Sequence, residues 1–165
     1  DEVIIDAVVA QSEAQCAALW GLREGVPEAQ RHEGTGSIKH DVSVPISRVS
    51  EFLREANKLV HGQMPAARIC AFGHMGDGNI HYNVNQPLDM DKDLFLKQWD
   101  IFKTIVHDLV NNMDGSISAE HGIGLLKRED MATYKNPVAL DLMRAVKHTL
   151  DPQNIMNPGK VLPDG

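Results

Sequence analysis

Ala71-Phe-Gly-His-Met-Gly-Asp-Gly-Asn-Ile-His-Tyr-Asn83 is the stretch that decides the fold, because Asp77-Gly78 stands between two segments of extended character. An Asp-Gly pair in this setting favours a β-hairpin with a type I′ turn, since both central positions of that turn need positive φ. With Asp77 and Gly78 as the loop residues, His74 lies opposite His81, with Cβ atoms about 4.5–5.5 Å apart. The sequence therefore predicts a hairpin that brings two imidazoles together.

The hairpin also divides into two faces, because successive side chains of a strand point to opposite sides of the sheet. One face carries both histidines, in the set Phe72, His74, His81 and Asn83. The other face is mostly apolar and carries Ala71, Gly73, Met75, Ile80, Tyr82 and Val84. We expect the apolar face to pack on a core and the histidine face to form a site.

Hydrophobic periodicity and turn residues predict the other elements. In chain order we expect a strand over 2–10, a helix from Ser12 to Gly25, a strand over 37–44, a helix over 47–61, the hairpin within 67–85, a helix over 91–112, a short extended piece over 116–119 and helices over 124–131 and 136–150. The central hairpin favours an α+β fold, in which an antiparallel sheet carries helices on one face and a C-terminal helical segment follows. A parallel doubly wound sheet is disfavoured by the same hairpin.

Two cations and one helical histidine have ordinary explanations when each is taken alone. Lys39 lies on the polar face of its predicted strand with Asp41, opposite the apolar side chains, and a solvated strand residue fits that position. Arg23 lies in the last turn of its helix, where a cation complements the helix C-terminus. We expect His107, on the long helix, to lie at the surface or its boundary.

Composition limits the class of protein. The chain has 165 residues, 42% hydrophobic and 24% charged, which is typical of one globular domain. Its net charge of −7 argues against a nucleic-acid surface but allows a local anion site. We find no apolar run long enough to span a membrane and no signal-peptide pattern. The chain begins at Asp1 within a strand-like pattern, so we expect it to be a piece of a longer protein.

Glu120 is the third candidate ligand for a metal ion held by His74 and His81. It lies in Ser118-Ala-Glu-His-Gly-Ile-Gly124, where glycine lets the backbone turn sharply close to a site. Two histidines and a carboxylate leave coordination positions open, as in catalytic metal sites. Zinc is the first expectation, and iron(II) or manganese suits the same ligands. Phosphate binding by the glycines is disfavoured, because no strand-to-helix context surrounds them.

Three motifs in order resemble those of a known family: 73–81 (GHMGDGNIH), 116–124 (SISAEHGIG) and 151–162 (DPQNIMNPGKVL). They resemble the C-terminal cap domain of FAD-linked 2-hydroxyacid dehydrogenases in the vanillyl-alcohol oxidase superfamily, with D-2-hydroxyglutarate and D-lactate dehydrogenases the most similar. The resemblance covers essentially the whole chain and implies a ferredoxin-like-related cap fold. It also implies an N-terminal FAD-binding domain and an initial part of the cap that lie outside these residues.

The resemblance assigns roles to particular residues. It implies His74, His81 and Glu120 as metal ligands and His121 as the catalytic base. Substrate contacts are implied for Arg23, Lys39 and Asn83, and a cofactor contact for Asn157 and Lys160. Dicarboxylate-using relatives carry a threonine where this chain has Pro27, which has no hydroxyl to donate.

The activity that this resemblance implies is oxidation of a D-2-hydroxy acid to the 2-oxo acid by hydride transfer to FAD. The expected partners are a small 2-hydroxy acid and an unidentified electron acceptor, with a homodimer allowed, in the cytoplasm or the mitochondrial matrix. We expect these residues alone to be inactive, because the flavin is bound elsewhere. Two alternatives use the same ligands: a self-contained metallohydrolase and a non-catalytic metal-binding module.

Overall fold

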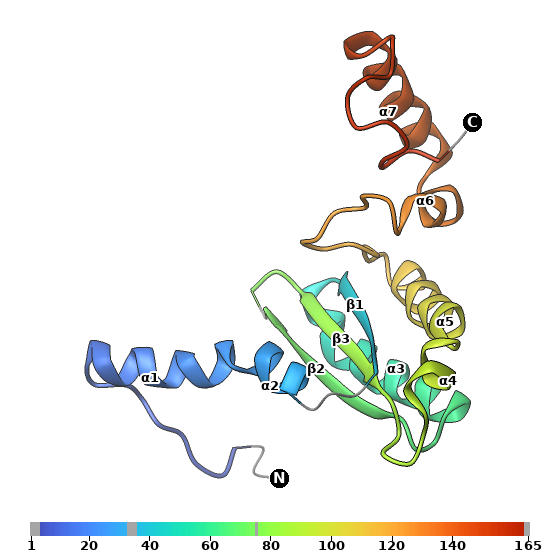
Figure 1. The fold of residues 1–165 in the computed structure, drawn as a ribbon. Helices are drawn as coiled ribbons and strands as arrows, with labels where there is room; N and C mark the ends of the chain where they lie inside the picture. The colour runs from blue at the N-terminus through green and yellow to red at the C-terminus, as the bar shows by residue number, and fades with distance from the viewer. Residues whose placement is uncertain (1–3, 33–35, 75, 164–165) are drawn as a thin grey trace. The chain divides into compact units, whose positions relative to one another are not determined.

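The computed structural model describes residues 4–32, 36–74 and 76–163, with the side chains of residues 31 and 32 left out. The chain divides into two compact units, an N-terminal unit over Asp1–Gly36 and a C-terminal unit over Ser37–Gly165. Figure 1 shows the helices and strands of both units.

The N-terminal unit contains two helices, α1 (Glu13–Glu24) and α2 (Val26–His32). The Ser12 side chain caps α1 by accepting a hydrogen bond from the backbone N–H of Gln15 at 3.2 Å, as its capping pattern predicts. Pro27 does not end the helical region, because it falls in the first turn of α2, where proline is tolerated. The chain therefore makes two helices where one was expected.

The strand expected over residues 2–10 is absent from the part of it that the structure describes, residues 4–10. Its β-branched side chains are open to solvent, with Ile5 97% and Val8 79% exposed. β-Branched residues favour a strand mainly through packing against cross-strand neighbours. Within the described residues of this unit no strand lies beside the segment. The strand preference of its β-branched residues is therefore not supported by cross-strand packing.

The C-terminal unit is built on a three-stranded antiparallel sheet in the order β1-β3-β2, with β1 at Ser37–Ser43, β2 at Arg68–His74 and β3 at Asn79–Asn85. Helices follow the strands: η1 (Ile46–Arg48), α3 (Val49–Gln63), α4 (Lys92–Leu96), α5 (Trp99–Asn112), α6 (Arg128–Tyr134) and α7 (Pro137–Leu150). The expected α+β class is confirmed. The long helix expected over 91–112 is instead divided between α4 and α5, and residues 116–119 make one bridge, Ser43 to Ser116, rather than a strand.

The core lies between one face of the sheet and the helices α3 and α5 (Figure 1). Fully buried side chains of the sheet and of both helices form it: Ile38, Val42, Phe52, Val60, Tyr82, Val84, Phe102, Val106 and Val110. Of the apolar face that alternation predicted for the hairpin, Ile80, Tyr82 and Val84 lie in this core. Ala71 on the edge strand is exposed, and Met75 lies outside the described residues. The opposite face of the sheet holds the histidines.

His107 is buried, with 2% of its surface exposed, so the surface position expected for it was wrong. Helix α5 packs on β1 and turns this ring toward His40, with ring centroids 6.0 Å apart. Tyr134 of α6 also lies against His107, with ring centroids 5.8 Å apart. Helical periodicity alone does not show which polar residue a neighbouring helix will cover.

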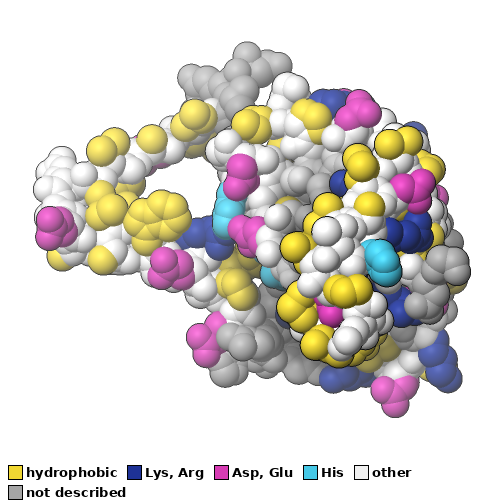
Figure 2. Space-filling view, turned by 90° about the horizontal axis from the view of Figure 1, so that it is seen from above, with side chains coloured by type: hydrophobic (Ala, Val, Ile, Leu, Met, Phe, Trp, Pro, Cys, Tyr) yellow, Lys and Arg dark blue, Asp and Glu magenta, His cyan; other side chains and the backbone are white. Residues whose placement is uncertain are grey.

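The C-terminal helix α7 begins at Pro137, close to the start predicted for it, and the side chain of Asn136 caps it by accepting hydrogen bonds from the N–H groups of Val138 and Ala139. One stripe along this helix is apolar and 58–71% exposed, and consists of residues spaced four apart: Val138, Leu142, Val146 and Leu150. Figure 2, a view from above, shows hydrophobic side chains exposed among charged ones.

Candidate metal and substrate site

The open face of the sheet gathers the polar side chains of all three strands. Strand register pairs Lys39 with Asn83 and Asp41 with His81 across β1 and β3. On the other side of β3, Phe72 pairs with His81 and His74 pairs with Asn79. Paired residues of an antiparallel sheet point to the same side. All of these side chains therefore share the face that α3 and α5 leave uncovered.

The hairpin register differs from the prediction by two residues. His74 pairs with Asn79, and its carbonyl oxygen accepts a hydrogen bond from the N–H of Gly78 at 3.2 Å, so the loop is longer than Asp77-Gly78. Tertiary contact selects this turn, because the carbonyl of Gly78 accepts a hydrogen bond from the N–H of Val44 at 3.2 Å. A shift of two preserves the face of every side chain. His74 and His81 stay on one face, diagonal rather than opposite, with ring centroids 6.0 Å apart.

Glu120 lies between the two histidines. Its Oε1 is 3.0 Å from His74 Nδ1 and its Oε2 is 3.4 Å from His81 Nε2. The structure thus brings together the three residues proposed as ligands, although they come from β2, β3 and a loop nearly forty residues further along the chain. The two imidazoles thus lie beside different oxygens of one carboxylate, and these residue types suit a divalent cation such as Zn²⁺ with positions left for a further ligand. The Glu120 and His74 side chains are 40% and 46% exposed, so an ion can reach them.

The loop that carries Glu120 is held against β1 by Asp41. Its Oδ2 accepts hydrogen bonds from the backbone N–H groups of Glu120 at 2.9 Å and of His121 at 2.8 Å. The backbone carbonyl of Asp41 also accepts from the N–H of Ala119 at 3.2 Å. Lys127 secures the loop by donating from Nζ to the carbonyl of Ile117 at 2.8 Å. The loop position is therefore set by both side-chain and backbone contacts.

His121 lies next to the three proposed ligands. Its ring stacks on that of His81, with centroids 5.7 Å apart and planes at 30°. Its Nδ1 is 3.6 Å from Asp41 Oδ2, and 67% of its side chain is exposed. A donor atom from each of Asp41, His81, Glu120 and His121 lies within 4.8 Å of the others, so Asp41 joins the cluster. Sequence reasoning had placed Asp41 on the polar face of its strand and had given it no role.

For both Asp41 and His81, burial shifts the pKa in one direction and the neighbouring groups shift it in the other. Burial alone would raise the pKa of Asp41, but the N–H groups of His121 and Glu120 stabilise its carboxylate and hold the pKa below its ordinary value. Burial lowers the pKa of His81, and the neighbouring carboxylates of Glu120 and Asp41 offset only part of that effect. At neutral pH the site therefore holds an ionised Asp41 and a neutral His81, the form in which imidazole binds a metal.

The substrate contacts expected from the sequence are divided between the two units. Lys39 and Asn83 are paired neighbours on the open face, where Asn83 is buried and Lys39 is exposed. Arg23 lies in the last turn of α1, and Pro27 lies in the first turn of α2. Both belong to the N-terminal unit. Lys39 and Asn83 therefore share a sheet face with the histidines, whereas the structure describes Arg23 only within its own unit.

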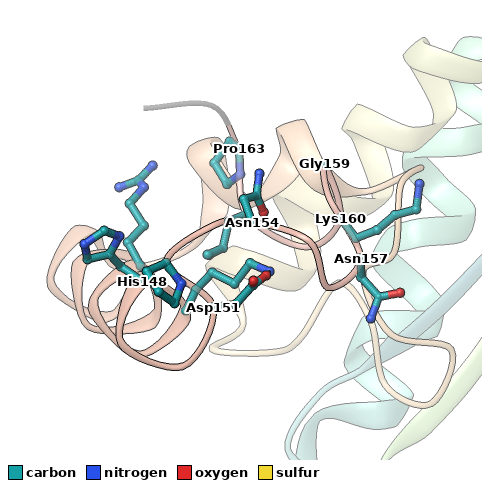
Figure 3. Close-up of a pocket in the computed structure, with 11 residues that line it drawn as sticks. His148, Asp151, Asn154, Asn157, Gly159, Lys160 and Pro163 are labelled. Carbon is teal, nitrogen blue, oxygen red and sulfur yellow. The ribbon is translucent and has the colours of Figure 1, made fainter.

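Asn157 and Lys160 line a separate cavity of about 320 Å³ at the end of α7. In Figure 3 these two residues lie on the tail loop, while His148 and Asp151 come from the helix end. Asp151 organises this loop by accepting hydrogen bonds from the backbone N–H groups of Ile155 and Met156, each at 2.9 Å. A cofactor contact by Asn157 or Lys160 stays a prediction.

The fold and the site define an α+β domain with a histidine–carboxylate cluster on the open face of its sheet. The chain matches the family model "FAD linked oxidases, C-terminal domain" over residues 1–161 and belongs to that family. The resemblance inferred from the three sequence motifs is thus confirmed.

Several curated relatives align with nearly the whole of this chain at moderate identity. It is 41% identical over 158 residues to D-2-hydroxyglutarate dehydrogenase of Stutzerimonas stutzeri, which covers 96% of this chain and 34% of the relative. It is 38% identical over 162 residues to the mitochondrial D-2-hydroxyglutarate dehydrogenase of Danio rerio, covering 98% and 29%. A putative mitochondrial D-lactate dehydrogenase of Schizosaccharomyces pombe is 36% identical over 168 residues, covering 96% and 31%. The chain spans about a third of the length of these relatives. Among the described residues, no helix is both long and apolar enough to cross a membrane.

Proposed function

We propose that this domain is the substrate- and metal-binding part of a flavin-dependent dehydrogenase that oxidises a D-2-hydroxy acid to the 2-oxo acid. The observation that carries the proposal is the position of Glu120 between His74 and His81, with His121 stacked beside them. Membership of the FAD linked oxidases and the names of the relatives support oxidation by FAD rather than hydrolysis or metal storage.

His74, His81 and Glu120 are the residues that would hold a divalent metal ion, with zinc the first expectation. A bound ion of this kind supplies positive charge that lowers the pKa of a nearby hydroxyl group. The support is the geometry of the protein alone: both nitrogen donors lie within 3.4 Å of the carboxylate that they would share an ion with.

Lys39, Asn83 and Arg23 are proposed to bind the substrate. Lys39 and Asn83 lie on the same face as the histidines, so a carboxylate bound there would meet an ammonium group and an amide. The guanidinium of Arg23 is suited to bind a carboxylate through two parallel hydrogen bonds. These cations allow a domain of net charge −7 to accept an anion. Pro27 offers no hydroxyl to a substrate carboxylate, so it does not decide between 2-hydroxyglutarate-like and lactate-like acids.

The proposed chemistry removes two hydrogens from C2 and its hydroxyl group. His121 accepts the hydroxyl proton, a role that imidazole performs well near neutral pH. The hydrogen on C2 leaves with its electron pair, and the product is the 2-oxo acid. FAD, bound by an N-terminal domain outside these residues, supplies the hydride acceptor. Asn157 and Lys160 are proposed to contact that cofactor, and reoxidation then needs an electron acceptor of unidentified nature. The cytoplasm or the mitochondrial matrix is the proposed compartment.

The test is metal and flavin chemistry in the full-length protein, with His81→Ala as the variant and His61→Ala, on the exposed surface of α3, as the matched control. We expect the wild type and the control to contain a divalent metal and to show flavin bleaching with D-2-hydroxyglutarate or D-lactate. The His81→Ala variant should lose the metal and at least ~100-fold of the bleaching rate. A wild type that binds no FAD or oxidises no 2-hydroxy acid would refute the proposal. Unchanged metal content in His81→Ala would remove the ligand assignment.

A further inference from the structure

We propose that Asp41 is a positioning residue that places the Glu120–His121 loop and orients two histidine rings. The inference rests on the proposed function, because the histidines act as a ligand and a base only in that reaction. Asp41 is 3% exposed, lies on β1 and belongs to none of the roles assigned above.

The first step is the backbone of the loop. A single oxygen, Asp41 Oδ2, accepts the N–H groups of Glu120 and His121 at 2.9 and 2.8 Å. The ligand and the base are consecutive residues, so one carboxylate oxygen fixes the peptide groups of both. Hydrogen bonds to a charged acceptor are worth about twice those between neutral groups. Asp41 is therefore the main side-chain anchor that holds the loop at the sheet.

The second step concerns the groups around the Asp41 carboxylate, which are hydrogen-bond donors. Besides the two backbone N–H groups, Asn79 Nδ2 donates to Asp41 Oδ1 at 3.3 Å. An asparagine amide at position 41 would keep one acceptor oxygen and place an NH₂ group against donors. The geometry thus requires a carboxylate rather than any polar side chain of the same size.

The third step concerns the histidines. His121 Nδ1 lies 3.6 Å from Asp41 Oδ2, and His81 Nδ1 lies 4.0 Å from Asp41 Oδ1, both beyond hydrogen-bond length. The other nitrogen of His81, Nε2, faces Glu120 at 3.4 Å. Histidines that ligate metals commonly donate their second ring N–H to a carboxylate, which fixes the tautomer. Asp41 lies on the Nδ1 side of both rings, where its negative charge favours a proton on Nδ1, and in His81 this leaves Nε2 as the nitrogen offered to the site.

These contacts separate a positioning role from direct ligation. Asp41 lies within reach of a shared ion, but Oδ2 already accepts two N–H groups and Oδ1 accepts a third hydrogen bond. These three hydrogen bonds compete with an ion for the carboxylate oxygens. Loss of Asp41 should therefore weaken metal binding without abolishing it, as expected for a residue that acts through the ligands.

The experiment compares Asp41→Asn with Asp130→Asn in the full-length protein, using Zn²⁺ as the probe. Asp130 is a matched control, because it is a buried carboxylate of α6 that contacts Lys103 and not the site. Zn²⁺ affinity is measured by chelator competition, and kcat and KM are measured separately with the 2-hydroxy acid. We expect Asp41→Asn to weaken Zn²⁺ binding about 10–100-fold and to lower kcat more than it raises KM. Asp130→Asn should leave the Zn²⁺ affinity within about twofold of the wild type.

Wild-type Zn²⁺ affinity and kcat in folded Asp41→Asn would overturn the inference. If Asp41→Asn does not fold, Asn79→Ala removes only the hydrogen bond to Oδ1, and we expect an approximately fivefold weaker Zn²⁺ affinity. An unchanged affinity in Asn79→Ala would then overturn it. A wild type that binds no Zn²⁺ or oxidises no 2-hydroxy acid would instead refute the proposed function, so the two failures are distinguishable.

Discussion

Acid should destabilise the C-terminal unit through the buried pair His40 and His107. Burial lowers the pKa of each imidazole to about 4, from an ordinary value of 6.5. The positive charge of Lys127 lowers both pKa values further, and each histidine has one buried ring nitrogen without a hydrogen-bond partner, Nε2 of His40 and Nδ1 of His107. Asp130 Oδ2 lies 3.7 Å from His107 Nδ1, too far to stabilise a charged ring by a hydrogen bond.

The sign of the effect follows from proton binding in the two states. Because these pKa values are lower in the folded protein, the unfolded chain binds more protons between pH 6.5 and 4. The free energy of unfolding is therefore highest above pH 6.5 and falls as the pH is lowered toward 4. Each pH unit below 6.5 is worth about 1.4 kcal/mol per histidine, so one ring contributes about 2 kcal/mol of destabilisation at pH 5. The two rings repel when both are charged, so their contributions are not simply doubled.

The assay is urea unfolding at pH 7.5 and pH 5.0, followed by circular dichroism, for the wild type and His107→Gln. The variant removes one titrating ring, so the loss of unfolding free energy between the two pH values should shrink by about 2 kcal/mol. His148→Gln, on the exposed surface of α7, should leave the pH dependence unchanged. Both pH values lie above the ordinary pKa of carboxyl groups, which limits their contribution. Equal pH dependence in wild type and His107→Gln would refute the reasoning.

Two further predictions concern the elements that position the site. Gly78→Ala should destabilise the protein by at least ~2 kcal/mol in thermal or urea unfolding, because φ at this residue is +74° and an added Cβ would lie 2.1 Å from the Val44 carbonyl oxygen. Gly62→Ala, in open space on α3, should instead be neutral or stabilising by up to ~1 kcal/mol, and equal effects would contradict the turn argument. Lys127→Met should cost about 1–3 kcal/mol in the same unfolding assay, because Nζ no longer satisfies the Ile117 carbonyl, and an unchanged midpoint would show that the loop needs no such contact.

Local alternation predicted the faces of the sheet, whereas the hairpin register depended on a contact that the local pattern does not contain. The face of a side chain follows from odd or even position, so His74 and His81 were placed on the site face correctly. The loop length is selected by the hydrogen bond between Val44 and Gly78, which joins segments 34 positions apart. An Asp-Gly pair carries no information about that partner. The register was therefore wrong by two, an even number that left the site intact.

The other incorrect predictions also depend on contacts between segments that are distant in the sequence. Residues 4–10 have β-branched side chains, but a strand needs a neighbouring strand, and the described residues of the N-terminal unit provide none. His107 belongs to the polar positions of α5 by periodicity, yet it is covered by Tyr134 of the helix that follows. Asp41 was overlooked as a site residue for a comparable reason. Its contacts depend on the β1–β3 register and on the approach of a loop 79 positions away.

The open face of the sheet is itself an argument for function. Asp41, Asn79 and Asn83 are each at most 4% exposed, yet they lie on the face opposite the core. Burying polar groups costs free energy unless hydrogen bonds replace those lost with water, and apolar residues there would serve stability better. One of these groups, Asn79 Oδ1, is buried without a hydrogen-bond partner. A sheet selected for stability alone would not place an ionised carboxylate and two amides beneath two histidines. Such a buried polar layer is expected where its role is to orient the groups above it, which is the role that Asp41→Asn is designed to test.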